Sequence, residues 1–311
     1  MMKTSMKATF SALAVASLLL AGSAAHAAKE VATPGVQNQI AKSVFAVKGA
    51  GKPVRGGGGG GTGISYHNGP VMVSGITVYP IWYGNISDST KSVISGFLNN
   101  VGGSPYFNIN TTYTNGSGQR VQNTPTTLKL STSSYSDANY SLGKALTDAN
   151  IQTLVSRALT NGVPTDANGF YLVITAPDVS ETSGFLTKYC GWHTYANLGT
   201  PSTAIKYSFV GDPTNGMSAC SAQTTSPSGN APADAMISVI AHELEEAATD
   251  PQLNAWYDGT GAENADKCAW NFGATSTATN GSKYNMTING VQYLVQQNWV
   301  NAGSGGCLLS Y

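Results

Sequence analysis

The feature that most constrains this chain is an acid-rich stretch at residues 241–251, Ala-His-Glu-Leu-Glu-Glu-Ala-Ala-Thr-Asp-Pro. Only 10% of the 311 residues are charged, against roughly a quarter in an average globular protein. Pro232 and Asp234 are typical of a helix start, because proline is tolerated in the first turn and an acid favours the helix N-terminus. Pro251 cannot continue a helix, so we expect this one to end at about Asp250.

One side of this helix is apolar and the other carries ionisable groups. At about 100° per residue, the apolar side consists of Ile237, Ile240, Ala241, Leu244 and Ala248. His242 and Glu246 lie on the other side, one turn apart, with Glu243 beside them. Donors at i and i+4 can bind one metal ion, and the glutamate after the first donor can activate a water, as in the His-Glu-x-x-His motif of metal hydrolases. Glu246 replaces the second histidine here, and the alternative is an amphipathic helix with a solvated polar side.

A zinc site needs a third protein ligand beyond the two on the helix. Glu263 is our candidate, since the chain between it and the helix is rich in turn residues. Asp266 joins the candidate metal set as a residue that orients or completes the ligands. Asp250 lies about 12 Å along the helix axis from His242, and we expect it to accept hydrogen bonds at the Asp-Pro turn instead. The alternative for Glu263 and Asp266 is a solvated loop held by Cys268.

His193 follows Cys190-Gly191-Trp192 and is the other notable histidine. Its predicted catalytic role is to hydrogen-bond an oxyanion as substrate is attacked. Metal ligation and a buried structural role are the alternatives. A serine nucleophile is not indicated, because the chain has no Gly-x-Ser-x-Gly elbow.

The first 27 residues have the pattern of a secretory signal peptide. Lys3 and Lys7 precede an apolar run at residues 8–21, and Ala25-His26-Ala27 is a small-x-small cleavage site. Cleavage there would remove two of the 16 basic residues and none of the 16 acidic ones. That balance gives no electrostatic basis for binding nucleic acid or an anionic membrane. We expect a secreted protein, extracellular, periplasmic or in a cell wall, with no membrane insertion after cleavage.

Four cysteines lie beyond the signal peptide, and an even number in an exported chain indicates two disulfides. Three connectivities are possible. We favour Cys190–Cys220 and Cys268–Cys307, because these pairs close the shorter loops. A cysteine metal cluster is the alternative, but the chain has no Cys-x-x-Cys pair.

Residues 28–63 are predicted to be an N-terminal segment, with a short helix at 36–46, followed by a linker that contains six consecutive glycines. One folded domain should span residues 64–311. Within it we predict strands at 71–83, 106–114, 126–131, 170–176 and 204–210, helices at 87–101 and 143–159, and a hairpin from 284–287 and 293–297.

This order of elements predicts an α/β (α+β) fold. We expect one zincin-like domain, with a mixed sheet packed on a backing helix and a metal-site helix; the comparison with zincins is an analogy of fold.

Several motifs together resemble the EXORDIUM family, also called phosphate-induced proteins. They are residues 66–70 (YHNGP), 78–84 (VYPIWYG), 190–193 (CGWH), 241–251, 263–273 (ENADKCAWNFG) and 296–301 (QQNWVN). The resemblance covers about residues 66–311 and implies a secreted protein, since the family is best known from plant cell walls, where its members promote cell expansion. It implies no established reaction. The chain departs from the family at Glu245, where alanine is frequent.

Two functions from different classes fit these observations. The first is a secreted metallohydrolase, with a peptidase as the main reaction class and a peptide or cell-wall component as substrate. Zinc is the expected cofactor, with calcium or manganese as alternatives, and Glu243 would activate water. The second is a non-catalytic extracellular protein with a structural metal or none, in which Trp192, Trp256 and Trp270 bind glycan. The sequence leaves the oligomeric state open.

Overall fold

The computed structural model describes residues 40–50 and 63–311. The predicted signal peptide and the run of glycines lie outside these residues. The region that resembles the family, about residues 66–311, makes up nearly all of the described structure. Residues 40–50 are the described segment that precedes it.

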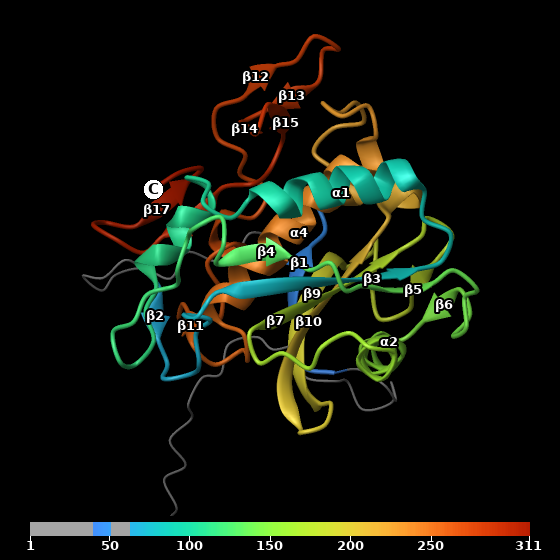
Figure 1. The fold of residues 1–311 in the computed structure, drawn as a ribbon. Coiled ribbons are helices and arrows are strands. Elements are labelled where there is room, and N and C mark those ends of the chain that lie inside the picture. Colours follow the sequence, from blue (N-terminus) through green and yellow to red (C-terminus); the bar gives the residue numbers. More distant parts are fainter. Residues whose placement is uncertain (1–39, 51–62) are drawn as a thin grey trace, which may run out of the picture.

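A mixed seven-stranded sheet forms the centre of the molecule (Figure 1). Its strands are, in spatial order, β1 (Ser43–Ala46), β9 (Tyr189–Leu198), β10 (Thr203–Gly211), β7 (Gly169–Thr175), β3 (Ile76–Tyr83) and β4 (Leu128–Leu130), and β5 (Tyr135–Asp137) also pairs with β3. β10, β7, β3, β4 and β5 run parallel to one another, whereas β9 is antiparallel to β10 and to β1. β7 is buried along its whole length, as the continuous apolar run at 170–176 predicts for a central parallel strand.

Helices cover both faces of this sheet. α1 (Asp88–Asn100) and α4 (Ala231–Thr249) lie on one face, and α2 (Asp148–Thr160) lies on the other (Figure 1). Ser87 caps α1 by accepting from the Thr90 backbone N–H, as its sequence predicts. α2 begins five residues later than predicted, because Thr147 and Asn150 form a capping box.

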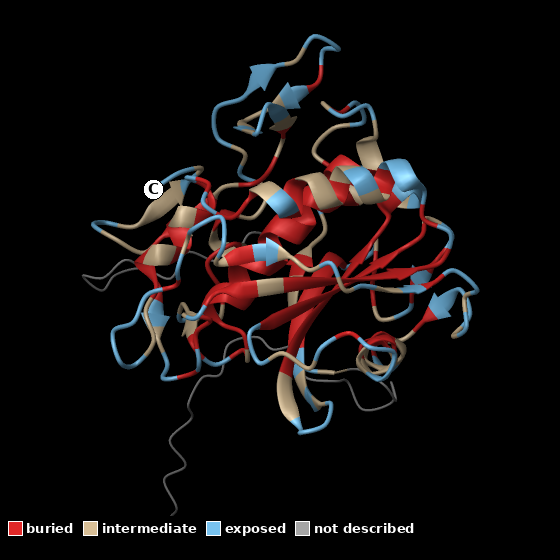
Figure 2. Ribbon diagram, in the orientation of Figure 1, coloured by how far each residue is buried: buried red, intermediate tan, exposed pale blue. Residues whose placement is uncertain are grey.

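α4 is buried on every side from Ala233 to its last residue (Figure 2). The helix begins beside Pro232 and has Asp250 as its C-cap, which confirms the bounds predicted from the prolines. The predicted apolar side packs in the core, but the opposite side is covered as well, since α4 contacts β1, β9 and β10 in addition to α1. The interpretation of α4 as a helix with a solvated polar side is therefore wrong.

The remaining elements are short. They comprise α3 (Met217–Cys220), the 3-10 helices η1 (Phe107–Thr112), η2 (Pro213–Gly216) and η3 (Asp266–Cys268), and the strand pairs β2 (Ser65–Tyr66) with β11 (Trp256–Tyr257), β6 (Ala145–Leu146) with β8 (Ser180–Glu181), β12 (Ser276–Thr277) with β13 (Lys283–Tyr284), β14 (Met286–Ile288) with β15 (Val291–Tyr293), and β16 (Asn298–Val300) with β17 (Gly306–Leu308). The hairpin around Asn289-Gly290 is confirmed as β14 and β15, shorter than predicted.

Both predicted disulfides are present. Cys190–Cys220 joins β9 to α3, and Cys268–Cys307 joins η3 to β17. The first bond lies three residues from His193, and the second anchors the segment that carries Glu263 and Asp266.

Two predicted elements are wrong. Residues 43–46 form strand β1 rather than part of a helix, because β9 offers an unpaired edge to them. Residues 107–112 form η1 rather than a strand. There the Thr111 and Thr112 hydroxyls donate to backbone carbonyls three residues earlier, which is the local bonding by which short polar side chains compete with strand pairing.

Gly191 tests how closely the sheet packs on α4. A Cβ added there would lie 2.5 Å from Val239 Cγ1 and 2.9 Å from the Phe209 carbonyl oxygen. We expect Gly191→Ala to lower the free energy of unfolding by about 1–3 kcal/mol, through overpacking. Gly259→Ala is the control, since a Cβ there meets nothing within 4 Å. Denaturant unfolding of both variants measures the difference, and equal stabilities would contradict this account of the packing.

Candidate metal centre

α4 places three of the predicted site residues at the interface with the sheet. His242, Glu243 and Glu246 are all fully buried. His242 Nε2 lies 2.9 Å from Glu246 Oε1, the contact expected for residues one helical turn apart. Asp266 Oδ1 lies 3.5 Å from the same ring nitrogen, and the Asp266 backbone N–H donates to Glu246 Oε1 at 3.1 Å.

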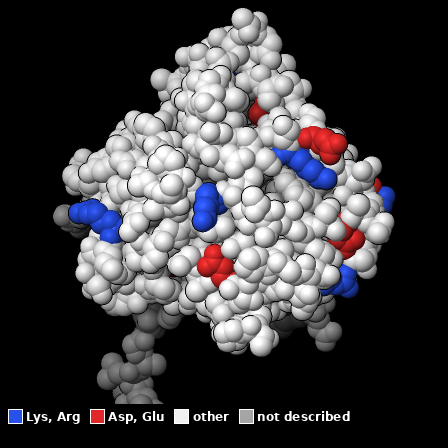
Figure 3. All heavy atoms as spheres, in the orientation of Figure 1, with Lys and Arg blue, Asp and Glu red and all other residues white. Residues whose placement is uncertain are grey.

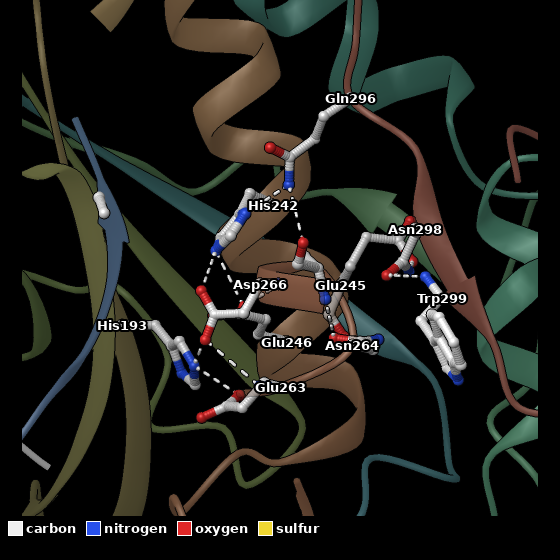
Figure 4. A network of polar contacts seen from close by, with 12 residues as sticks. His193, His242, Glu245, Glu246, Glu263, Asn264, Asp266, Gln296, Asn298 and Trp299 are labelled. Carbon is white, nitrogen blue, oxygen red and sulfur yellow. Dashed lines mark hydrogen bonds and ion pairs between the residues drawn. The ribbon is translucent and has the colours of Figure 1, made fainter. Parts of the chain in front are cut away.

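β9 brings His193 to the opposite side of Glu246. Its Nε2 lies 3.4 Å from Glu246 Oε2 and 3.1 Å from Glu263 Oε2. Figure 4 shows His193, His242, Glu246, Glu263 and Asp266 pointing toward one another from β9, α4 and the segment after it. The predicted convergence of the helix with Glu263 and Asp266 is therefore present in space.

The donors form two overlapping groups among the residues that the structure describes. His193, Glu246 and Glu263 have ligand atoms within 4.8 Å of one another, and so do His242, Glu243 and Glu246. Glu246 belongs to both groups. The predicted set of His242, Glu246 and Glu263 is divided between them, because Glu263 faces His193. The distance pattern thus makes His193 a candidate ligand.

Burial and mutual charge set the ionisation of the cluster. Burial acts to raise the pKa of Glu246, but the positive charges of His242 and His193 outweigh it and hold this pKa at about 2. Burial acts to lower the pKa of both histidines, and the facing carboxylates raise each pKa well above its ordinary 6.5. Glu246 thus stays ionised between the two histidines, and a divalent cation would compete with protons for the same groups.

Glu243 differs from its neighbours. Neither of its carboxylate oxygens has a hydrogen-bond partner within the described part of the chain. Burial raises the pKa of Glu243 to about 8. A buried carboxyl group with no hydrogen-bond partner is costly and needs an explanation, so Glu243 stands out from the rest of the cluster.

Three residues that the sequence analysis did not assign support the centre. Gln296 Nε2 lies 2.5 Å from His242 Nδ1 and holds the ring so that Nε2 faces Glu246. The Phe45 ring stacks on the other side of His242, with centroids 4.4 Å apart. Gly191 leaves room for Glu243, since a Cβ there would lie 3.2 Å from Glu243 Oε1. Gln296 and Gly191 lie in motifs of the family resemblance, whereas Phe45 gave no sequence signal.

Glu245 also lies on this buried turn but points away from the two groups. Its Oε2 accepts hydrogen bonds from the side-chain amides of Asn110 and Asn298, and the Asn264 amide donates to its backbone oxygen at 3.1 Å. Burial raises the pKa of Glu245 to about 8. The acid that departs from the family pattern is thus held by a separate set of amides.

The structure also bears on two further expectations, the role of Asp250 at the turn and the exposure of three tryptophans. Asp250 accepts from the backbone N–H groups of Asn254 and Ala255 at 2.5 and 2.6 Å, which confirms its role at the turn. Trp192 is completely buried and cannot stack on a glycan, whereas Trp256 and Trp270 are half-buried.

The surface carries few charges. On the face shown in Figure 3, basic and acidic side chains are scattered among uncharged ones and form no patch of one sign. No helix of residues 40–50 and 63–311 is long and apolar enough to cross a membrane. The two disulfides are compatible with a secreted protein.

Fold and site together define a mixed α/β domain with a buried histidine–carboxylate cluster between its sheet and its longest helix. A family model described as the phosphate-induced protein 1 conserved region matches residues 64–308. The chain belongs to this family, which confirms the resemblance found in its motifs.

Relatives with this family's names come from plants. The chain is 32% identical to Protein EXORDIUM-like 3 of Arabidopsis thaliana, across 76% of this chain and 80% of that protein. It is 32% identical to Protein EXORDIUM-like 5 of the same plant, across 63% of this chain and 60% of that protein. Protein PHOSPHATE-INDUCED 1 of Nicotiana tabacum is 26% identical, across 63% and 67%. No solved structure matches the chain.

Glu245 gives a pH test that separates it from the cluster. Because burial raises its pKa from 4.5 to about 8, the protonated side chain contributes stability that is complete below pH 4.5 and is lost as the pH rises through 8. Glu245→Gln keeps an oxygen for both asparagines and cannot ionise. We expect the variant to gain stability relative to the unchanged protein between pH 5 and pH 8, as measured by denaturant unfolding. A constant difference over that range would contradict the assignment.

Proposed function

We propose that this protein is a secreted hydrolase with a divalent-metal centre, and that it is a peptidase. The observation that carries the proposal is the convergence of two histidines on Glu246 beside the partnerless carboxyl group of Glu243. A buried cluster of this kind is relieved of like-charge repulsion and desolvation by a cation.

Within the predicted metal set of His242, Glu246, Glu263 and Asp266, extended by His193, we assign the ligands to one group. His193, Glu246 and Glu263 supply three protein ligands, the number found in catalytic zinc sites that keep a fourth position for water. This choice leaves Glu243 free. His242, held by Gln296, then positions the second oxygen of Glu246, at 2.9 Å, with Asp266 beside it.

A bound divalent ion would polarise a substrate carbonyl and lower the pKa of a water. Glu243 would accept the proton of that water and return it to the leaving group. Neither of its oxygens has a hydrogen-bond partner among the described residues, which leaves them open to such a water. His242 accepts from Gln296 at Nδ1, so its Nε2 carries the proton and would hold the Glu246 carboxylate in place at 2.9 Å.

The donor set bears on the identity of the metal. One histidine with two carboxylates is a harder ligand set than three histidines, so zinc is joined by manganese and calcium as candidates. A zincin-like arrangement is part of the proposal. It is supported by a metal-site helix packed under β9, near the edge of a mixed sheet, with α1 beside that helix as its backing.

The second candidate is a non-catalytic extracellular protein with a structural ion. The burial of the cluster favours it, since His193, His242 and Glu246 have no exposed surface. In this case Glu243 would be a further ligand rather than a base. Variants at single positions distinguish the two candidates.

Metal binding tests the ligand assignment. After loading with zinc and dialysis, His193→Ala and Glu263→Ala should retain no stoichiometric metal, whereas Gln296→Ala and His242→Ala should bind roughly 10- to 100-fold more weakly, as for residues that orient a ligand. His67→Ala is the matched control, because that histidine is exposed and stacks on Tyr257. Metal retained in His193→Ala but lost in His242→Ala would transfer the assignment to the group of His242, Glu243 and Glu246. The observation in favour of that group is the contact between Gln296 and His242.

Catalysis is tested separately at Glu243. Glu243→Gln should keep the metal and lose about 10²- to 10⁴-fold in peptide hydrolysis, the range typical of a general acid–base residue. Cleavage of a random peptide library, followed by mass spectrometry, is the measurement. Glu245→Gln serves as the control on the same helix. Undiminished cleavage by Glu243→Gln would refute the mechanism, and loss of metal from it would favour the structural ion.

A further inference from the structure

The candidate centre is closed on one side by β1. Phe45 is 1% exposed, and its ring stacks between His242 and Trp270 at centroid distances of 4.4 and 4.9 Å. In the antiparallel register, Phe45 lies opposite Gly191 and Ser43 lies opposite His193. Residues directly opposite share a face of the sheet, so Phe45 and Ser43 lie on the face that carries the metal centre.

The backbone of this segment is held by bonds that any peptide can make. The Thr194 hydroxyl donates to the Ala41 carbonyl at 2.6 Å, Trp270 Nε1 donates to the Ala46 carbonyl at 3.0 Å, and the Val47 N–H donates to the Lys188 carbonyl at 3.0 Å. Together with the ladder to β9, these contacts are those of an extended peptide added to a sheet edge.

Two side chains of the segment enter specific places. Phe45 occupies the space between His242 and Trp270. Lys42 makes a buried salt bridge with Asp148 Oδ1 at 2.9 Å, where the two side chains are 2% and 0% exposed. The strip along β9 therefore has an aromatic position and, three residues earlier, a basic position.

β1 lies outside the region that defines the family. The family model begins at residue 64, and the intervening residues 51–62 include six consecutive glycines. All residues of the metal cluster and all of β9 lie within the matched region. The edge of β9 is thus a complete surface of the family domain, and the segment on it is joined to that domain by sequence typical of a linker.

We propose that the edge of β9 is a docking site for an extended peptide with the pattern basic-x-x-aromatic, and that residues 40–48 are a resident occupant supplied by the chain itself. This deepens the proposed function by naming the substrate class, because a peptide in this position passes His193 and the candidate centre. The tethered segment competes at an effective concentration in the millimolar range, so a free peptide binds well only when the segment is weakened.

The test uses a fluorescent peptide of residues 40–48 and the full chain carrying Lys42→Ala and Phe45→Ala. Fluorescence anisotropy with EDTA present should show binding to this variant at least tenfold tighter than to the unchanged chain. Peptides with norleucine in place of Lys42, or alanine in place of Phe45, should each bind at least tenfold more weakly. Lys144→Ala is the matched control, because it removes an exposed ion pair with Asp178, and it should behave as the unchanged chain does. No gain of binding by a folded double variant would overturn the proposal.

Hydrogen exchange on the unchanged chain covers the case in which the double variant does not fold. The amides of β1 should exchange through an opening of lower free energy than those of β9 and β10. Equal protection of β1 and β10 would show an integral strand and overturn the proposal. Because peptide binding is measured without metal, it can succeed where metal analysis fails, and the two proposals are separable.

Discussion

The structure depends on the complete burial of a charged helical turn. His242, Glu243, Glu245 and Glu246 are consecutive or nearly so, and none has solvent to stabilise its charge. Removing a charge from water is costly unless partners replace the hydration shell. The surrounding elements therefore supply polar partners for this turn as well as apolar side chains for the core.

The turn is stabilised in two chemically different ways. Glu245 accepts hydrogen bonds from the amides of Asn110 in η1 and Asn298 in β16, which favour its carboxylate, but burial outweighs them and raises its pKa to about 8. Glu246 is held by two histidines, so its carboxylate stays ionised with a pKa of about 2. Adjacent residues on one helix thus carry opposite ionisation tendencies, as happens where different environments separate the pKa values of paired acids. Glu243 is stabilised in neither way, since neither of its carboxylate oxygens has a hydrogen-bond partner among the described residues.

Local signals predicted a large part of the fold. Ser87 and the prolines around α4 determined where helices begin and end, and the apolar run at 170–176 indicated the central strand. These features depend on neighbours in sequence. The burial of the polar side of α4 was not predictable in the same way, because it depends on β9 and β1, which pair with distant segments. For the same reason the sequence indicated that His193 was of interest but gave no indication that it faces Glu263, 70 residues later.

The two proposals involve different parts of the chain, one inside the region that the family model matches and one that includes residues before it. Every residue of the cluster, together with Gln296 and the β9 edge, falls inside the matched region of residues 64–308. A metal centre, if bound, is therefore a property to be sought in the family domain itself. The side chain that covers that centre from β1 is Phe45, which stacks on His242 and precedes the domain. A closed, dry site strengthens the electrostatic interactions within it, but it also excludes substrate. If both proposals hold, the strength of β1 pairing would decide how far the cluster is open to a peptide.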